Sequence, residues 1–385
     1  MKFLLLILTL TTMLYFNSCI FTTESDSDKE KFDTTSEIKF ENEFFYKMIK
    51  RIDNSIVLFG SGNEHLIMKK IDSSGNLIWQ KEYEENIGYH YLTNFEITND
   101  GGFLVSGYFS HNNSGGTPFI AVFDNEGLMK WIKKDDDLIL DNTDSFKAVE
   151  DSNGDIVTVT QSGMARWDSE GNLIWLHWFY QGYFYEYNSV VYYILNLYDF
   201  TVNDGICYIL YDSPYSDFVA AYYDIDGNLE HGYFFNNEIP NNLQIINTAG
   251  FGYASYPQFR ILGNTENIDG EIDFFMMEAL TYTNNAFPKS ETYSSKETFD
   301  CYIGDIFKDG EELIITSSYD SKVVCLDYNT FELKWKYNDD SKASGDFSST
   351  VRIEDENYLV LIPNDTWNEN SEEVRGTTLR FFKRN

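Results

Sequence analysis

The sequence predicts an all-β fold, a seven-bladed β-propeller of four-stranded antiparallel blades. Three observations lead to this prediction. A turn-and-tryptophan phrase recurs along the chain, four short β-like runs surround its copies, and the two ends of the chain each supply part of one further unit. A repeat of about 40 to 50 residues with four strands per unit is typical of propellers.

The repeated phrase sets the period. It reads "DSSGNLIW" at 72–79, "DNEGLMKW" at 124–131 and "DSEGNLIW" at 168–175. The Asp that opens the phrase recurs at positions 224 and 327. The 255 residues from Asp72 to Asp327 hold five intervals averaging 51 residues, if one degenerate unit at 259–282 is counted.

The residue types of the phrase predict a turn that leads into an outer strand. Asp can cap such a turn through its side chain, and Gly supplies the positive φ that the turn requires. The predicted turn glycines are Gly75, Gly127, Gly171 and Gly227. The tryptophans expected on the fourth strand, packing between neighbouring blades, are Trp79, Trp131, Trp175 and Trp335.

The clearest whole unit runs from Asn94 to Lys134. Its β-like runs are "NFEI", "FLVSGYF", "FIAVFD" and "LMKWIKK", separated by the turns "TNDGG" and "NEG" and by one longer loop. Short runs rich in Val, Ile, Phe and Tyr between Asn-Asp-Gly turns predict an antiparallel meander. The same order recurs at 146–179, 198–235 and 304–337.

The ends of the chain predict how the ring closes. After the last phrase, residues 349–385 contain three β-like runs and no fourth. The N-terminal run "EIKFENEF" (37–44) has the pattern of the fourth strands elsewhere. We therefore expect this N-terminal strand to complete the last blade, which removes two exposed sheet edges. Six or eight blades would require one of the irregular units to be miscounted.

Three segments are predicted along the chain. Residues 1–18 form a lipoprotein signal peptide, with a short apolar run after Lys2 and a lipid-attachment site at Cys19. Residues 19–36 form an acidic flexible tether, because they contain too few apolar residues to form a core. Residues 37–385 form the propeller domain. The alternative is an ordinary secretory signal with an incidental cysteine.

The charge balance limits the partners. Lys and Arg number 28 against 62 Asp and Glu, a net charge of −34, which argues against binding nucleic acid or anionic lipid headgroups. We therefore expect a monomer that touches the membrane through its lipid anchor only. Its expected location is the cell envelope, anchored to the outer membrane on the surface or periplasmic side.

Two stretches resemble known propeller repeats. Residues 94–134 look like the "DGG…G…D…G…W" repeats of exported bacterial proteins, and "VVCLDYNTFELKW" (323–335) resembles the quinoprotein (PQQ-like) repeat. Quinoprotein dehydrogenases would imply pyrroloquinoline quinone and calcium, but they typically have eight blades and a vicinal disulfide, and this chain has no adjacent cysteines. The lipoprotein of the outer-membrane β-barrel assembly machine shares the repeat style without a cofactor. We accordingly expect no cofactor.

No motif points to an enzyme. The five histidines show no metal-ligand spacing, and no metalloprotease, nucleophile-elbow or phosphate-loop motif occurs, so no catalytic or metal-binding residue is predicted. The acidic runs 135–144 and 151–155 could offer oxygen ligands to Ca²⁺, although solvated loops are the favoured interpretation. Cys207 and Cys325 lie in strand-like runs and are expected to be buried small hydrophobes.

Loop lengths separate the two faces of the predicted disc. The turns between strands one and two and between strands three and four are short. The long insertions fall on the opposite face, at 110–118, 180–195, 264–271 and 364–376. Binding sites are commonly carried by loops on a rigid scaffold.

One long insertion is rich in aromatic residues, with nine among the sixteen from Trp178 to Tyr193. Rings with a hydroxyl at the edge suit sugars or protein partners. The predicted binding residues are Trp178, Tyr180, Tyr183, Tyr185 and Tyr187. Alternatively, the segment packs over the disc or extends a blade by one strand.

The sequence thus predicts an envelope lipoprotein that acts as a binding or assembly scaffold for a protein or glycan partner. The alternative is a polysaccharide lyase or hydrolase with its site on the long-loop face. Convergent charged side chains around a deep central pocket would favour the enzyme, and a flat aromatic rim would favour binding.

Overall fold

The computed structural model describes most of the chain after the predicted signal and tether. It describes residues 32–384 except 63–64, 84–88, 111–115, 135–145, 161–162, 179–182, 188–189, 194–196, 204–205, 214–215, 225, 236–239, 247–257, 267–271, 281–290, 295–302, 318–321, 339–347 and 368–372. Within these residues no helix is long and apolar enough to cross a membrane.

The described residues form seven four-stranded antiparallel sheets and one two-stranded sheet. The first sheet contains β2 (Glu43–Lys50), β3 (Ile56–Gly62), β4 (His65–Ile71) and β5 (Leu77–Tyr83). The second contains β6 (Tyr89–Ile97), β7 (Phe103–Ser110), β8 (Gly116–Phe123) and β9 (Met129–Lys134). The third contains β10 (Phe146–Glu150), β11 (Ile156–Thr160), β12 (Gly163–Trp167) and β13 (Leu173–Trp178).

The remaining sheets follow the same order. The fourth contains β16 (Leu197–Asn203), β17 (Ile206–Ser213), β18 (Ser216–Tyr223) and β19 (Leu229–Phe235). The fifth contains β20 (Pro240–Ile246), β21 (Gln258–Glu266), β22 (Ile272–Leu280) and β23 (Glu291–Ser294). The sixth contains β24 (Ile303–Asp309), β25 (Glu312–Ser317), β26 (Lys322–Asp327) and β27 (Leu333–Asn338). The seventh contains β28 (Ser349–Glu354), β29 (Asn357–Trp367), β30 (Glu373–Arg384) and β1 (Phe32–Glu41).

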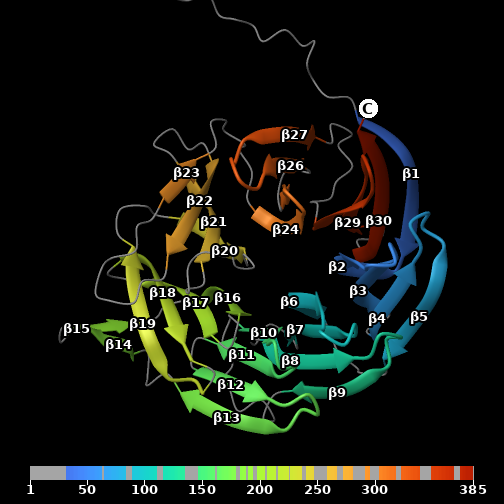
Figure 1. Cartoon of the computed structure of the whole chain (residues 1–385). Coiled ribbons are helices and arrows are strands. Elements are labelled where there is room, and N and C mark those ends of the chain that lie inside the picture. The colour runs from blue at the N-terminus through green and yellow to red at the C-terminus, as the bar shows by residue number, and fades with distance from the viewer. Residues whose placement is uncertain are drawn as a thin grey trace, which may run out of the picture.

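The sheets are arranged around a common centre. Figure 1 shows the first strands, such as β2, β6 and β24, nearest the middle and the fourth strands, such as β5, β9 and β13, at the outside. The predicted strand order within each repeat, including the degenerate unit around 259–282, is therefore confirmed.

The repeated Asp caps the turn before the fourth strand, as predicted. In the first sheet, Asp72 Oδ1 accepts hydrogen bonds from the backbone N–H groups of Ser74 and Asn76, at 2.9 and 2.8 Å. Gly75 has a φ of +87°, a conformation in which a side chain would be strained. The same side-chain bonds form at Asp124, Asp168 and Asp224, and their glycines also have positive φ.

Three of these turns, at Gly127, Gly171 and Gly227, lie on the tryptophan of the preceding sheet. A Cβ placed on Gly127 would come within 2.9 Å of the Trp79 ring, and one on Gly171 within 3.0 Å of Trp131. Trp131 also donates a 2.9 Å hydrogen bond to the carbonyl of Ser169, in the turn of the next sheet. The prediction that the tryptophans pack between neighbouring sheets is confirmed.

The apolar core lies between the sheets. One cluster joins the first and second sheets through Phe59 and Phe119, and another joins the third and fourth through Val159 and Phe200. Buried aromatic and aliphatic area of this kind is the main favourable contribution to folding. Among the described residues, Cys207 and Cys325 are buried and unbridged, as expected.

The two ends of the described chain pair with each other. β1 runs antiparallel to β30, with Phe32 opposite Arg384 and Glu41 opposite Gly376. The strand begins at Phe32, so five residues of the segment predicted as tether lie in it. The seventh sheet also contacts the first, because the Phe45 N–H donates a 2.8 Å hydrogen bond to Thr377 Oγ1 and the two sheets share one apolar cluster.

Candidate functional site

A cavity of about 440 Å³ lies among the first strands of six sheets, β2, β6, β10, β16, β24 and β28. Figure 1 places β2, β6, β10, β16 and β24 around the centre of the molecule. A cavity of this volume is within the range of small-molecule sites. Its polar lining residues are Lys47, Lys50, Asn94, Glu96, Lys147, Asp199, Asp305, Lys308, Ser349 and Thr350.

Irregular strand pairing places four of the polar lining residues at one level of the cavity. The pairing of the first strand with the second shifts register just before Lys47, Asn94, Asp199 and Asp305. A bulge bends a strand and re-aims a side chain. Each of these four first strands thus presents one polar residue at an equivalent position, and Lys147 occupies the corresponding place near the start of β10.

Two lysines of the lining, Lys47 and Lys147, are paired across sheets. Lys47 Nζ lies 3.3 Å from Asp305 Oδ1, which joins the first and sixth sheets. Asp305 also accepts a 2.6 Å hydrogen bond from Ser349 Oγ of the seventh sheet. Lys147 forms an ion pair with Asp199 of the fourth sheet. These contacts connect sheets around the cavity, and they pair the ammonium groups of Lys47 and Lys147 with carboxylates.

Glu96 is the lining carboxyl group with a perturbed pKa. Burial raises the pKa of Glu96, while hydrogen bonds from the Glu150 N–H at 2.8 Å and from Asn94 Nδ2 at 2.9 Å act in the opposite direction. A raised pKa is a property that a general acid needs. Both Glu96 oxygens nevertheless accept hydrogen bonds, and the one from the Glu150 N–H joins the second and third sheets, which is a structural role.

The aromatic insertion forms its own small sheet. β14 (Tyr183–Tyr187) pairs with β15 (Val190–Tyr193), with Tyr187 opposite Val190, and this two-stranded sheet is separate from the four-stranded ones. Figure 1 shows it at the periphery and not over the centre. In the described residues, the segment therefore does not extend a four-stranded sheet by one strand.

The structure brings part of the predicted binding set together. Tyr183, Tyr185 and Tyr187 lie in one strand, and Trp178, at the end of β13, is 48% exposed. Several predictions fall outside the described residues: the signal peptide, the lipid site Cys19, residues 19–31 of the tether, Tyr180 and the acidic run 135–144.

The acidic segment 151–155 forms the turn between β10 and β11. Asp151 Oδ1 caps this turn by accepting from the N–H groups of Asn153 and Asp155. Arg166 Nη2 lies 2.7 Å from Asp151 and 2.6 Å from Asp155, so a guanidinium neutralises the two carboxylates. Over the part of the chain that the structure describes, no three His, Cys, Asp or Glu residues are grouped to hold a metal ion.

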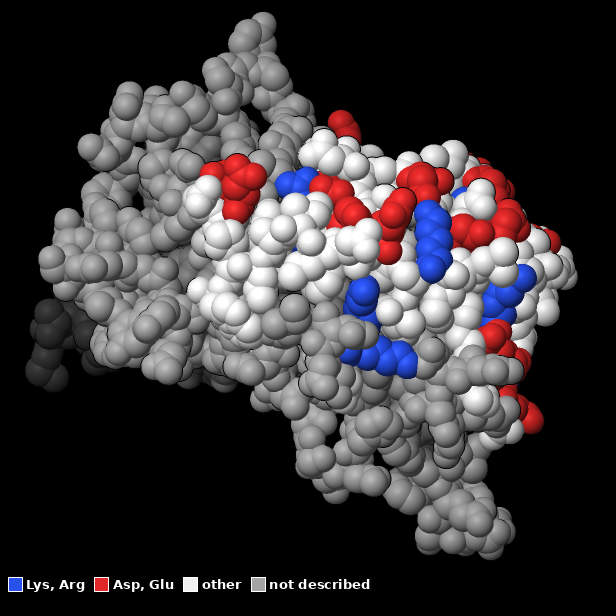
Figure 2. All heavy atoms as spheres, turned by 90° about the horizontal axis from the view of Figure 1, so that it is seen from below, with Lys and Arg blue, Asp and Glu red and all other residues white. Residues whose placement is uncertain are grey.

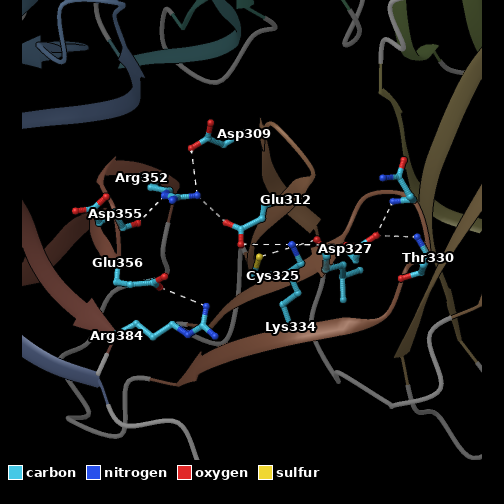
Figure 3. A network of polar contacts seen from close by, with 12 residues as sticks. Asp309, Glu312, Cys325, Asp327, Thr330, Lys334, Arg352, Asp355, Glu356 and Arg384 are labelled. Carbon is cyan, nitrogen blue, oxygen red and sulfur yellow. Dashed lines mark hydrogen bonds and ion pairs between the residues drawn. The ribbon is translucent and has the colours of Figure 1, made fainter. Parts of the chain in front are cut away.

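A second polar network joins the sixth and seventh sheets (Figure 3). Arg352 of β28 lies 3.1 Å from Glu312 and 3.8 Å from Asp309, both of the sixth sheet. Lys334 lies 3.6 Å from both Glu312 and Asp327. Because Arg352 and Lys334 each pair with carboxylates of the network, and Arg352 does so across the two sheets, we interpret it as a contact between sheets.

The sequence reasoning missed the ring of Lys47, Lys147, Asp199 and Asp305. These residues are far apart in the chain and differ in charge, so no local motif marks them. Alignment of the first β-like run of each repeat would have revealed one polar residue at the same position.

No family model matches the chain, and no curated protein matches its sequence. Solved structures do match. The β-propeller domain of Cps50 (Swd1) from Myceliophteria thermophila is 6% identical with a TM-score of 0.52, covering 90% of this chain and 99% of that one. Hydrazine synthase from Kuenenia stuttgartiensis is 10% identical with a TM-score of 0.52, covering 89% and 97%.

A third match is Hsv2 from Kluyveromyces lactis, 12% identical with a TM-score of 0.50, covering 89% of this chain and 99% of that one. At such identities the likeness concerns the fold alone. Together with the four-stranded antiparallel sheets around a centre, it shows that the chain has a β-propeller fold.

Proposed function

We propose that this chain is a lipid-anchored envelope protein whose propeller is a binding or assembly scaffold for a protein or glycan partner. The observation that carries the proposal is the aromatic two-stranded sheet β14–β15, which follows the exposed Trp178 and belongs to none of the four-stranded sheets. A peripheral aromatic element on a rigid framework suits recognition of a sugar or a protein surface.

The scaffold is proposed to be a ring of seven blades closed by β1. The seven four-stranded sheets, the pairing of β1 with β30, and the apolar cluster shared by the first and seventh sheets support this arrangement. The lipid on Cys19, the outer-membrane location, the monomeric state and the absence of nucleic-acid partners follow from the sequence pattern and the charge of −34.

Charged side chains converge on the central cavity, which by the criterion given above favours an enzyme, but their pairing across sheets favours a scaffold. Lys47 and Lys147 are matched by Asp305 and Asp199, as in contacts that hold sheets together. A polysaccharide lyase or hydrolase is the alternative function, and the observation that favours it is the raised pKa of Glu96 beside the cavity.

The binding proposal is tested by capture from an envelope extract and by a glycan array with the mature protein. The triple variant Tyr183→Ala, Tyr185→Ala, Tyr187→Ala should lose the captured ligand and keep the wild-type thermal melt. The control is Tyr83→Phe, which removes only a 2.6 Å hydrogen bond to the Gly127 carbonyl in another sheet. Equal binding by the triple variant and the wild type would contradict the proposal.

The anchor is tested separately. Replacement of Cys19 by Ala should abolish incorporation of a labelled fatty acid and move the protein from the membrane fraction to the soluble fraction. A wild-type protein that takes up no label would disprove the lipid anchor without bearing on the binding sheet.

The alternative function has a test of its own. Cleavage of a polysaccharide by the wild type, lost in Glu96→Gln, would establish the enzyme in place of the scaffold.

A further inference from the structure

The pairing of the chain ends determines the face from which the N-terminal tether leaves. In the first four sheets and in the sixth, a turn joins the third strand to the fourth; in the seventh, β30 and β1 take these places without such a turn. Phe32 and Arg384 therefore lie where that turn would be. The Arg384 N–H also donates a 2.9 Å hydrogen bond to Glu356, in the turn between β28 and β29. The tether thus leaves from the face that carries both sets of short turns, here called the short-turn face.

The same face carries a row of exposed aliphatic side chains. Leu77, Leu128 and Leu173 are 56%, 56% and 40% exposed, and each follows the capped turn before the fourth strand of its sheet. Ile78 and Ile174, the next residues in two of these strands, are also half exposed. The three sheets are consecutive. These five residues are called the aliphatic rim, and exposed apolar side chains that gather on neighbouring elements mark a candidate interaction site.

The aliphatic rim begins beside β1, the strand that follows the tether. A Cβ placed on Gly75 would contact the side chains of Ile38 in β1 and Phe381 in β30. The turn that precedes Leu77 therefore lies directly on the seventh sheet. From there the rim continues to the second and third sheets, away from β1.

The length of the tether limits how far the domain can lie from the membrane. The 13 peptide units from Cys19 to Phe32 span at most about 47 Å when fully extended. A compact domain of this length has a radius of gyration of about 20 Å. A lipid on Cys19 would thus hold the short-turn face within about one domain width of the bilayer.

We propose that the aliphatic rim rests on the surface of the membrane that holds the anchor, among zwitterionic headgroups. This inference rests on the proposed lipid at Cys19, and it replaces the expectation that the lipid is the only contact with the membrane. The capping carboxylates Asp72, Asp124 and Asp168 are beside the rim, and they suit the outer ammonium groups of phosphatidylethanolamine but repel anionic lipids. Figure 2, an edge-on view, shows Asp and Glu gathered mostly toward one border, with Lys and Arg further from it.

The proposed orientation has a consequence for the binding element. Trp178 is at the opposite end of β13 from Leu173, so it lies toward the other face. With the aliphatic rim on the membrane, Trp178 points away from the bilayer, where a soluble or neighbouring envelope partner can reach it.

Hydroxyl-radical footprinting of the full mature chain tests the orientation, because it reports the solvent accessibility of individual side chains. The chain is attached through Cys19 to phosphatidylethanolamine–phosphatidylcholine vesicles, either by its own lipid or by coupling the Cys19 thiol to a maleimide phospholipid. Oxidation of Leu77, Leu128 and Leu173 should fall several-fold relative to unattached protein. Oxidation of Trp178 should stay unchanged, and vesicles rich in phosphatidylglycerol should protect the rim less.

Unchanged oxidation of the aliphatic rim on neutral vesicles, or protection of Trp178 in its place, would overturn the orientation. Rim protection that appears without vesicles and depends on protein concentration would also overturn it, since the occupant would then be a second copy of the chain. The maleimide attachment makes this result independent of natural lipidation, which the Cys19→Ala fractionation decides. Failure of the anchor and failure of the orientation are therefore distinguishable.

Discussion

Two interfaces between neighbouring sheets cover a tryptophan in different ways. One lies between the second and third sheets, and the other between the sixth and seventh. In the former, the turn at Gly171 lies on Trp131, whose ring is part exposed and donates to the Ser169 carbonyl. In the latter, no such turn exists in the seventh sheet, and the Phe32 ring lies 5.5 Å from the ring of Trp335. Trp335 is 2% exposed, and its Nε1 has no hydrogen-bond partner among the described residues.

The difference shows how a chain end replaces a covalent turn. Between the second and third sheets, the turn covers Trp131 and its backbone supplies a hydrogen-bond acceptor. The turn at Gly127 covers Trp79 in the same way, although Trp79 Nε1 has no hydrogen-bond partner among the described residues. Where β30 and β1 meet without a turn, aromatic rings cover the tryptophan: Phe32 lies 5.4 Å from Tyr337, and Tyr337 stacks on Phe382 at 4.4 Å. The terminal interface therefore depends more on buried apolar area, and the internal interface more on backbone geometry.

Truncation of the two tryptophans gives the largest expected contrast. Trp335→Ala should lower the free energy of unfolding by about 4 kcal/mol, because it opens a cavity in a buried aromatic cluster. Trp131→Ala should cost about 2 kcal/mol, since its part-exposed ring loses less buried area and one hydrogen bond. Chemical denaturation of both variants measures the difference. Equal losses in the free energy of unfolding would mean that the terminal interface depends no more on buried apolar area than the internal one.

A glycine pair tests the backbone side of the comparison. Gly171 and Gly310 both have positive φ, +83° and +60°, but a Cβ on Gly171 would meet the Trp131 ring whereas one on Gly310 meets nothing within 4 Å. Gly310→Ala should therefore cost about 1 kcal/mol from backbone strain alone. Gly171→Ala should cost about 2 kcal/mol, because the ring must also move. If the two variants melt at the same temperature, the contact between turn and tryptophan contributes little.

Repetition in the sequence made these features predictable. The Asp, Gly and Trp of the phrase recur at matched spacing, and local turn chemistry fixes their conformations, so the capped turns and the inter-sheet tryptophans were expected from residues such as Asp72, Gly75 and Trp79. The start of β1 at Phe32 was not predicted, because residues 32–36 are polar after the first and their pairing with β30 depends on the far end of the chain.

The candidate site was less predictable for a related reason. Lys47 and Asp305 meet at 3.3 Å although 258 residues separate them, and only the arrangement of the sheets around a centre brings them together. Among 62 acidic residues, spacing alone cannot single out Asp199 or Asp305. The aromatic composition of 178–193 was visible in the sequence, but its separation as a two-stranded sheet depends on strand pairing that composition does not specify.

The smallest expected effect concerns a pair of carboxyl groups at the internal interface. Burial, with the nearby charge of Glu96, raises the pKa of Glu150 to about 6, whereas hydrogen bonds from Lys130 and Thr98 hold the pKa of Asp100 down at about 2. A carboxyl group with a raised folded-state pKa lowers stability as the pH rises from its unfolded value, about 4.3, through 6. One with a depressed pKa adds stability above its unfolded value and loses it in acid.

Glu150→Gln should therefore leave stability nearly unchanged at pH 4 and raise it by about 1 kcal/mol at pH 8, after allowance for partial exposure. The Gln oxygen can still accept the hydrogen bond from the Asn99 N–H. Asp100→Asn, the matched control in the same cleft, should instead lower stability at pH 8. Denaturation curves at the two pH values measure both effects. A Glu150→Gln variant that is less stable than the wild type at pH 8 would mean that the Glu150 charge holds the second and third sheets together, and that the internal interface relies on electrostatics as well as on turn geometry.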